Sequence, residues 1–503
     1  MEDKKIKAPL DHWVLWPTVV IFACFCLFVA TDKDGADNFI KVAFSFLTGK
    51  LGWIYQVGVF GYFVILMWFA FSKYGNKKLG DVKPEFSTFT WWGMIFTVSS
   101  SASVLVWTSL ESFYYVKYPP FGLAPFSRES YEWAQAYSLF HWGPVPFAIY
   151  SLLGIMFGYA MHVKKEDISR PSGLFRLVYG RSFENSWKGK LIDILILFSL
   201  VCGYGTSLGV CTPLISKLLQ QLFGIDPSVR VDTVILLAVT GLIAICLYAG
   251  LYKGIALLSN IRVIVGYGLL VILFCIGPTS FMINNFVDSF GTLLQNFIRM
   301  TFYTDPHGGG SFPQDWTIFY FAWFISAAVF CGMYLARISA GRSVRQVLLG
   351  SVAANAVGNW IYFIVLQNYG IVLQSQKALP FDEILETGGT AGVTVATWTL
   401  FPAAGFFLVA FLFLAYIATT TFINGSVYTC AMMTTKNLSP NEQPSRPLRL
   451  FWSLLIGAIA IALLYIGGLK PVQTISIIGT LPTVIIIYAM IYVFLKAIKK
   501  DQW

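Results

Sequence analysis

Residues 315–324 read DWTIFYFAWF and contain two tryptophans, one tyrosine and three phenylalanines. They lie in a chain of 503 residues that is 56% hydrophobic and only 12% charged. This composition excludes an ordinary soluble enzyme and is typical of a protein with many membrane-spanning helices. The rings of this stretch either pack against lipid and neighbouring helices or form a site, and their depth in the membrane bears on which.

The stretch opens one of twelve apolar runs. A helix needs about 20 apolar residues to cross a bilayer. The sequence predicts spans near residues 13–30, 51–72, 90–112, 133–161, 191–216, 233–251, 263–283, 316–336, 346–372, 400–433, 450–468 and 473–496. The first run is too long for a signal peptide and no clear cleavage site follows it, so we expect the mature chain to begin near Met1.

Basic and acidic residues alternate along the segments that connect these runs. Lysine and arginine in short loops mark the cytoplasmic side of a membrane protein. The basic segments carry Lys4, Lys5 and Lys7, then Lys73, Lys77, Lys78 and Lys83, then Lys164, Lys165, Arg170, Arg176 and Arg181, then Lys253 and Arg262, then Arg337, Arg342 and Arg345, then Lys436, Arg446 and Arg449, then Lys496, Lys499 and Lys500. Both termini are therefore predicted to be cytoplasmic, and the net charge of +10 needs no nucleic acid partner.

The sequence lacks the motifs of soluble catalysis. None of the four histidines has metal-ligand spacing with another histidine or a cysteine, and no Walker loop or nucleophile elbow is present. The eight cysteines lie within apolar runs, so no disulfide framework is expected. Transport without a cofactor or metal is favoured, and a cation channel or an ammonium sensor stays open as another class.

Two predicted spans contain polar runs, TVSSSASV at 97–104 and IATTTFINGS at 417–426. Such residues can bend a helix or line a path, but close packing between helices explains them equally well. If spans three to seven and eight to twelve form five-helix units, their odd number gives an inverted repeat. We expect three parts: residues 1–89 with two helices, 90–310 with the first repeat and an amphipathic connecting segment, and 311–503 with the second repeat and a short cytoplasmic tail.

The depth of a tryptophan in the membrane distinguishes an interfacial ring from a candidate site ring, because indoles normally lie at the membrane–water interface. Span eight enters from outside near Trp316, so Trp323 lies about 10 Å deeper in a core about 30 Å thick. By the same count Trp142 lies about 15 Å deep. A glycine and two prolines follow Trp142, interrupt the helix and leave room for a cavity.

Trp316, Tyr320 and Trp323 follow the spacing of one helix face. An aromatic stripe buried between helices explains this spacing as well as a site does. We expect no anionic partner at this depth, which suits a quaternary ammonium, since ring faces hold a cation that has no N–H to donate. Three phenylalanines point elsewhere and are interpreted as packing or lipid contacts: Phe319, Phe321 and Phe324.

At this stretch the sequence resembles the betaine/carnitine/choline transporters. Their signature is Gly, Ser, Asp or Asn, then Trp-Thr, an aliphatic residue, any residue, Phe or Tyr, Trp, any residue and Trp-Trp, and residues 315–324 depart from it only at Phe321 and Phe324. FHWGPVPF, PPFGL, FYTDP, GGGSFP and LARISAGR extend the resemblance, which is closest to the carnitine/γ-butyrobetaine antiporter branch. It implies an all-α polytopic membrane protein with twelve transmembrane helices, two of them N-terminal to two inverted five-helix repeats of the LeuT type.

The resemblance also implies roles for single residues. It places Tyr114, Trp142 and Trp323 in a central trimethylammonium box, and Trp316 and Tyr320 on an outer substrate path. Counted along a straight span, however, Tyr114 lies near the outer surface, and a broken span three would reconcile the two positions. At other positions in or next to the substrate site that the resemblance implies, this sequence has a different residue from the carnitine/γ-butyrobetaine antiporter branch: Phe147, Phe324, Ala327, Phe330 and Cys331.

Three further features follow from the same branch. Arg262 matches an arginine that stands near a sodium position, although an ordinary basic residue at the start of a span is the alternative. Residues 99–103 lack the glycine-rich loop of sodium-coupled members, so sodium-independent exchange is implied. Glu111 also matches, and we interpret it as a gate or structural residue.

The sequence thus predicts antiport of L-carnitine against γ-butyrobetaine or a related betaine by alternating access. The resemblance adds a homotrimer in the lipid bilayer of a bacterial inner membrane. Sodium- or proton-coupled uptake of glycine betaine or choline for osmoprotection is the first alternative.

Overall fold

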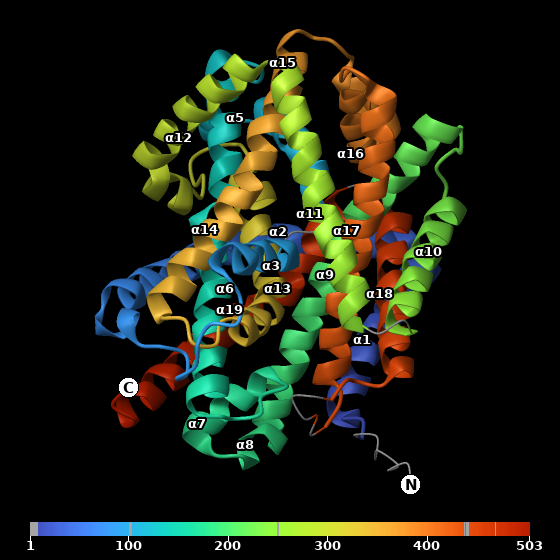
Figure 1. Ribbon diagram of the computed structural model, residues 1–503. Coiled ribbons are helices and arrows are strands. Elements are labelled where there is room, and N and C mark those ends of the chain that lie inside the picture. Colours follow the sequence, from blue (N-terminus) through green and yellow to red (C-terminus); the bar gives the residue numbers. More distant parts are fainter. Residues whose placement is uncertain (1–8, 100–102, 249–250, 437, 439–441, 468) are drawn as a thin grey trace.

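The computed structural model describes residues 9–99, 103–248, 251–436, 438, 442–467 and 469–503, and for 243–248 and 251–260 only the backbone. The regular elements of these residues are helices (Figure 1), with two isolated β-bridges, Leu10 to Thr435 and Lys78 to Ser343. The predicted all-α fold is confirmed. The structure describes the two polar runs to different extents. Residues 100–102 of the run 97–104 lie outside the described residues, whereas the run 417–426 lies within one helix, Ala404–Met433.

The α-helices are α1 (His12–Thr31), α2 (Lys33–Phe71), α3 (Thr88–Ser99), α4 (Ser103–Lys117), α5 (Arg128–His141), α6 (Pro144–Gly158), α7 (Arg176–Tyr179), α8 (Ser182–Asn185), α9 (Trp187–Phe223), α10 (Val229–Tyr248), α11 (Leu251–Ile276), α12 (Thr279–Phe302), α13 (Ile318–Ile338), α14 (Val344–Tyr362), α15 (Asn368–Ser375), α16 (Phe381–Thr399), α17 (Ala404–Met433), α18 (Arg446–Ile466) and α19 (Lys470–Lys500). Short helical turns are η1 (Lys73–Asn76), η2 (Pro120–Gly122), η3 (Tyr159–Val163), η4 (Pro171–Phe175), η5 (Pro313–Thr317) and η6 (Phe363–Gln367).

Among the described residues, nine helical segments are long and apolar enough to cross a membrane, and eleven if two bent pairs each count as one span. Predicted span 233–251 is not among them, and it runs into residues 249–250, outside the described part of the chain. The structure therefore supports a polytopic membrane protein. The count of twelve and the boundaries 1–89, 90–310 and 311–503 stay predictions.

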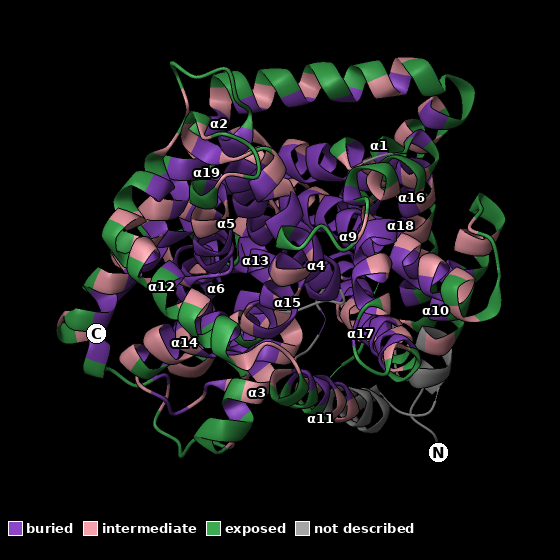
Figure 2. Cartoon of the chain, turned by 90° about the horizontal axis from the view of Figure 1, so that it is seen from above, coloured by how far each residue is buried: buried purple, intermediate pink, exposed green. Residues whose placement is uncertain are grey.

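The core lies around α6, α9 and α13 (Figure 2). Helix α6 is apolar on every side, and every residue from Val145 to Gly158 is buried, as expected for a helix without a polar face. Glycines let α6 approach α13 closely, because a side chain at Gly332 would clash with Leu153. By contrast α12 has one apolar and one polar face and lies at the surface.

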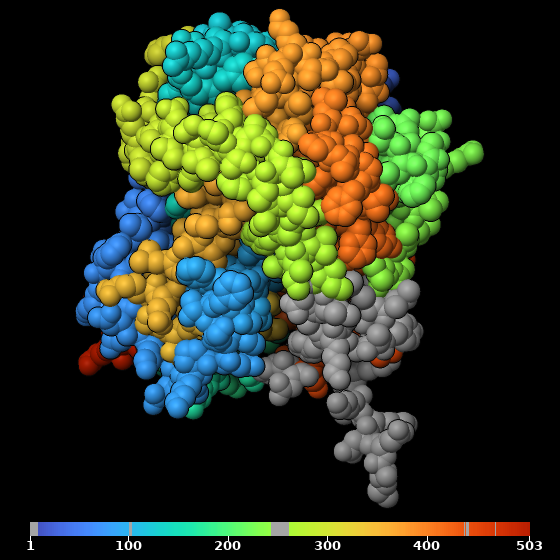
Figure 3. All heavy atoms as spheres, turned by 45° about the horizontal axis from the view of Figure 1, so that its top comes forward, coloured from blue at the N-terminus to red at the C-terminus, as the bar shows by residue number. Residues whose placement is uncertain are grey.

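Two pairs of helices are bent at short breaks. Helices α3 and α4 differ in direction by 70°, and the part of α11 from Ile261 differs from α12 by 107°. In Figure 3 the second pair, in yellow-green, runs as one band across the surface. The first bend changes the depth of every residue in α4 relative to a straight span, so depth counts along span three do not hold.

Both ends of the described chain contact the segment between α6 and α9. Asp11 pairs with Arg170 at 2.5 Å, and Asp501 pairs with Lys164 at 3.0 Å. Figure 1 accordingly shows α1 and the C-terminus toward the end of the molecule that carries α7 and α8. The two ends thus lie on one side of the fold, the side that the basic residues predict to be cytoplasmic.

Asp11 sits at a buried ionic contact that ties three segments together. It accepts hydrogen bonds from Arg170 and Lys190, and Arg170 also donates to the Thr435 carbonyl at 2.7 Å. Burial acts to raise the pKa of the Asp11 carboxyl, but the hydrogen bonds from Lys190 and Arg170 outweigh burial and lower it. The contact therefore contributes stability above the ordinary carboxyl pKa, and that stability is lost only as the pH falls through the lowered value.

We expect Asp11→Asn to destabilise the protein by about 3 kcal/mol, because the buried Arg170 guanidinium loses its 2.5 Å partner and keeps, among the described acidic groups, only Glu184, at 4.0 Å. The apparent melting temperature in detergent measures this loss, which should be constant from about pH 5 to 8 because the folded pKa lies below that window. Glu132→Gln is the control, since its pair with Arg128 is exposed. Equal shifts in both variants would contradict a special role for Asp11.

Candidate functional site

Trp142 lies where the chain breaks between α5 and α6. Gly143 is extended, and Pro144 begins α6 without a backbone N–H to donate. The break frees the Leu139 carbonyl, because Gly143 N donates instead to Phe140 at 3.1 Å. The indole N–H of Trp360 on α14 donates to Leu139 at 2.9 Å, so the break is satisfied from a neighbouring helix.

Five rings gather at this break, and we call them the aromatic cluster: Trp142, Phe147, Tyr320, Trp323 and Phe324. Trp142 lies 5.9 Å from Trp323 and 5.7 Å from Tyr320 between ring centroids, with edge-to-face geometry. It also lies 5.5 Å from Phe324, which contacts Phe147 at 5.0 Å. The structure thus brings the two predicted deep indoles together from segments far apart in the sequence.

The phenylalanines of the stretch 315–324 do not face lipid. Phe319 and Phe321 are fully buried, and Phe319 stacks on Trp323 at 5.9 Å. Phe324 belongs to the aromatic cluster. The lipid alternative for these three residues is wrong, because α13 lies in the core and every side of it meets protein.

Tyr114 lies outward of the aromatic cluster. Its ring neighbours within the described chain are Phe113 on α4 at 5.9 Å, Tyr118 at 6.3 Å and Trp316 at 5.3 Å. Trp316 in turn stacks on Tyr320 at 6.4 Å. The structure therefore groups Tyr114 with the predicted outer path, and Tyr320 joins that path to the aromatic cluster.

Glu111 lies against the aromatic cluster, and the expectation of no anionic partner at this depth is wrong. Its carboxylate accepts a hydrogen bond from the Trp142 indole N–H at 2.7 Å and another from the Tyr320 hydroxyl. The side chain is fully buried. A depth count along a straight span misses this contact, since α4 follows the 70° bend.

Two further rings touch the aromatic cluster, and neither was predicted from the sequence. Trp107 on α4 lies 6.3 Å from Trp323, and Phe363 in η6 lies 5.5 Å from Trp142. The signal that the sequence offered for Trp107 is its position as an indole well inside predicted span 90–112. Phe363 lies in an otherwise apolar run and gives no local signal.

Arg262 lies beside the last turn of α3. Its guanidinium is buried and donates to the Thr97 carbonyl at 3.2 Å. Arg262 therefore lies next to residues 99–103, the segment in which the glycine-rich loop of sodium-coupled members is missing. Residues 100–102 of this segment lie outside the described chain. In the part that is described, Ser99 donates a short hydrogen bond to the Asn355 side chain.

A small cavity adjoins the aromatic cluster and has room for about one water molecule. Its lining includes Ser99, Asn355, Cys331 and Tyr150, whose ring lies 6.1 Å from Phe324. The predicted position Cys331 therefore faces a small, mainly apolar space beside the rings that Ser99 and Asn355 also line. The rings themselves are in mutual contact, so a substrate must separate them to bind among them.

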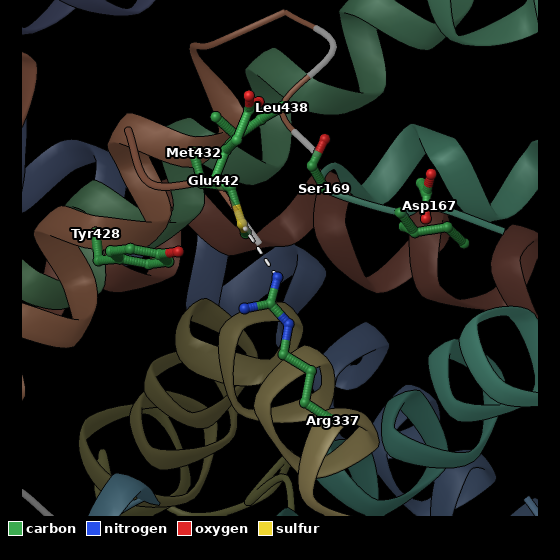
Figure 4. Close-up of a pocket in the computed structure, with 8 residues that line it drawn as sticks. Asp167, Ser169, Arg337, Tyr428, Met432, Leu438 and Glu442 are labelled. Carbon is green, nitrogen blue, oxygen red and sulfur yellow. Dashed lines mark hydrogen bonds between the residues drawn. The ribbon is translucent and has the colours of Figure 1, made fainter. Parts of the chain in front are cut away.

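A second small cavity lies near the ends of α13 and α17 and is shown in Figure 4. Arg337 donates to the Met432 sulfur at 3.5 Å there, and Asp167 and Glu442 also line the space. It is too small for an organic substrate. Among the described residues no group of three His, Cys, Asp or Glu side chains could hold a metal ion.

Comparison with known proteins gives a family match and similar solved structures. Residues 13–503 match the model of the BCCT, betaine/carnitine/choline family transporters. The fold is also similar to a Na⁺-coupled sialic acid symporter in a substrate-bound outward-open state, with 14% sequence identity and a TM-score of 0.46 over 88% of this chain and 86% of that one.

Cys331 offers a test of the cavity. In a variant that keeps only this cysteine, we expect slow labelling by N-ethylmaleimide, because the side chain is buried. Saturating γ-butyrobetaine should slow it further by occupying the adjacent aromatic cluster. A variant that keeps only the exposed Cys275 is the control and should be insensitive to the ligand. Equal protection of both cysteines would contradict a site beside Cys331.

Proposed function

The chain belongs to the betaine/carnitine/choline transporter family, and from this premise we propose that it exchanges L-carnitine for γ-butyrobetaine or a related betaine without sodium. It is a multi-pass membrane protein and a secondary transporter, not an enzyme. Exchange by alternating access would use a site reached in turn from each side.

The aromatic cluster is the observation that carries this proposal. A trimethylammonium group has no N–H, so it is best bound by ring faces, and Trp is the strongest such partner. Trp142 and Trp323 meet nearly at right angles, 5.9 Å apart, beside a break between helices. If these two rings moved apart, a cation between them would meet the face of one ring and the edge of the other. Rotation of the second ring would then turn its face toward the cation as well.

The other end of a betaine needs hydrogen-bond donors. Ser99 and Asn355 line the small cavity beside the aromatic cluster and carry donor groups that suit a carboxylate. Arg262, which lies near the end of α3, would supply a permanent positive charge where coupled relatives use an ion. Exchange of substrates of equal charge then needs no ion gradient.

Counterflow in liposomes tests the transport mode. We expect labelled carnitine to enter only vesicles that contain unlabelled substrate, with no requirement for sodium or a pH gradient. Vesicles without internal substrate are the control. Sodium-driven uptake into these empty vesicles would refute antiport and favour coupled uptake for osmoprotection, whereas passive electrical currents would favour a channel.

Trp323→Ala should weaken binding of γ-butyrobetaine by about 5- to 30-fold, equivalent to about 1–2 kcal/mol for a desolvated cation–π contact. Intrinsic fluorescence or calorimetry on purified protein measures the affinity. Trp53→Ala is the matched control, because Trp53 lies exposed on α2. An affinity within about twofold of the wild type, for Trp323→Ala and Trp142→Ala alike, would show that the site lies elsewhere.

Arg262→Ala should abolish most of the sodium-independent exchange, because it removes the charge beside the Thr97 carbonyl. We expect added sodium to restore part of the activity by occupying the vacated position. Arg230→Ala on the exposed start of α10 is the control. Full activity of Arg262→Ala without sodium would leave Arg262 as an ordinary basic residue at the membrane surface.

A further inference from the structure

Glu111 presents a buried carboxyl group without a basic partner to the aromatic cluster. One oxygen, Oε1, accepts from the Trp142 N–H at 2.7 Å and from the Tyr320 hydroxyl. The other, Oε2, is buried and makes no hydrogen bond with the described residues. Both donors to Oε1 are neutral, so they favour the ionised carboxylate without supplying a counter-charge, and a cation bound in the rings would supply it.

Two basic side chains at the ends of neighbouring helices have other partners. Lys117 on α4 pairs with Asp382, and Lys470 on α19 pairs with Asp315. Within the described chain no ion pair involves Glu111. The groups that face it are Tyr115 on its own helix, Ser138 on α5 and Tyr320 on α13.

His141 is the closest imidazole, and its ring nitrogens contact neutral hydroxyls. Nδ1 lies 2.8 Å from the Tyr115 hydroxyl and Nε2 lies 3.0 Å from the Thr317 hydroxyl. Its ring stacks on Tyr320 at 5.0 Å. His141 therefore packs against Tyr320 and forms no ion pair with Glu111.

We propose that Glu111 is the counter-charge and positioning residue of the site, and that it selects among trimethylammonium compounds by where their own negative charge lies. This inference rests on the proposed function of the aromatic cluster. A carboxylate beside the rings attracts the ammonium and repels a second carboxylate, and the repulsion falls with distance. Compounds with no carboxylate, or with a distant one, are favoured over those that carry it close to the nitrogen.

Three probes of one head group separate attraction from repulsion. Choline has no carboxylate, glycine betaine carries it one carbon from the nitrogen, and γ-butyrobetaine carries it three carbons away. In wild-type protein, the negative charge of Glu111 lowers the affinity for glycine betaine relative to γ-butyrobetaine and to choline. The effect requires only that the three head groups bind in the same rings.

Glu111→Gln tests the charge at nearly constant shape, because the amide oxygen still accepts from Trp142 and Tyr320. Titration of the full-length protein in detergent should show choline affinity reduced by about tenfold, γ-butyrobetaine affinity reduced less, and glycine betaine affinity changed by less than about threefold or improved. A ratio of choline to glycine betaine affinity that falls by at least about threefold supports the proposal.

A purely structural role gives a different pattern. If Glu111→Gln weakens all three probes by the same factor, or leaves all three unchanged, the proposal is overturned while the aromatic cluster stands as a binding site. If the wild-type protein binds none of the probes, the proposed function fails first. Melting temperature and gel filtration establish that the variant is folded.

Tyr320→Phe provides a second, independent test if the Glu111→Gln variant does not fold. It keeps the ring and removes one donor that stabilises the ionised carboxylate of Glu111. We expect the preference for choline over glycine betaine to fall in this variant, in the same direction as in Glu111→Gln, even if all affinities fall through a looser ring. An unchanged or larger preference would contradict the proposal.

Discussion

The need to satisfy every backbone polar group inside the membrane governs where this fold can place a site. A helix can be broken in the hydrocarbon region only where neighbouring protein takes over the freed hydrogen bonds. At Trp142 the freed Leu139 carbonyl is taken by the Trp360 indole of α14. Near the end of α3 the Thr97 carbonyl is taken by Arg262 of α11. The candidate substrate site lies between these two supported breaks, where the backbone opens beside the packed core.

In the proposed site the aromatic cluster would combine two kinds of contact that act on different parts of a substrate. Ring faces attract any trimethylammonium group, and they do so with little regard to what the rest of the molecule carries. The Glu111 carboxyl group is held to one side by the Trp142 and Tyr320 donors, so its charge would act from one direction. Phe147 and Phe324 offer smaller rings than an indole, so under the proposal a charge on Glu111 has proportionally more influence on selectivity.

Ion pairs at the two ends of the molecule differ in burial. Lys117–Asp382 and Lys470–Asp315 join separate helices on the side of Tyr114 and Trp316. The Asp11–Arg170–Lys190 contact joins the start of α1, the loop after α6 and α9 on the opposite side. The first two pairs are partly exposed and contribute little, whereas breaking the buried contact by removing one partner is costly. If the proposed alternating access separates helices at both ends, the end that carries Asp11 is the one where a buried contact must be lost.

The sequence by itself determined the class of protein, because composition and apolar run length are properties of the chain alone. It also predicted that Trp142 and Trp323 share one depth, because the rise of a helix converts position into depth, and the two rings do meet. It did not determine that Glu111 meets them, since the 70° bend between α3 and α4 breaks that conversion. Nor did it show that Phe324 faces Trp142, because the core position of α13 makes all its faces protein-facing. Only the tertiary structure decides which residues of equal depth share one space, since depth gives a single coordinate and contact requires three.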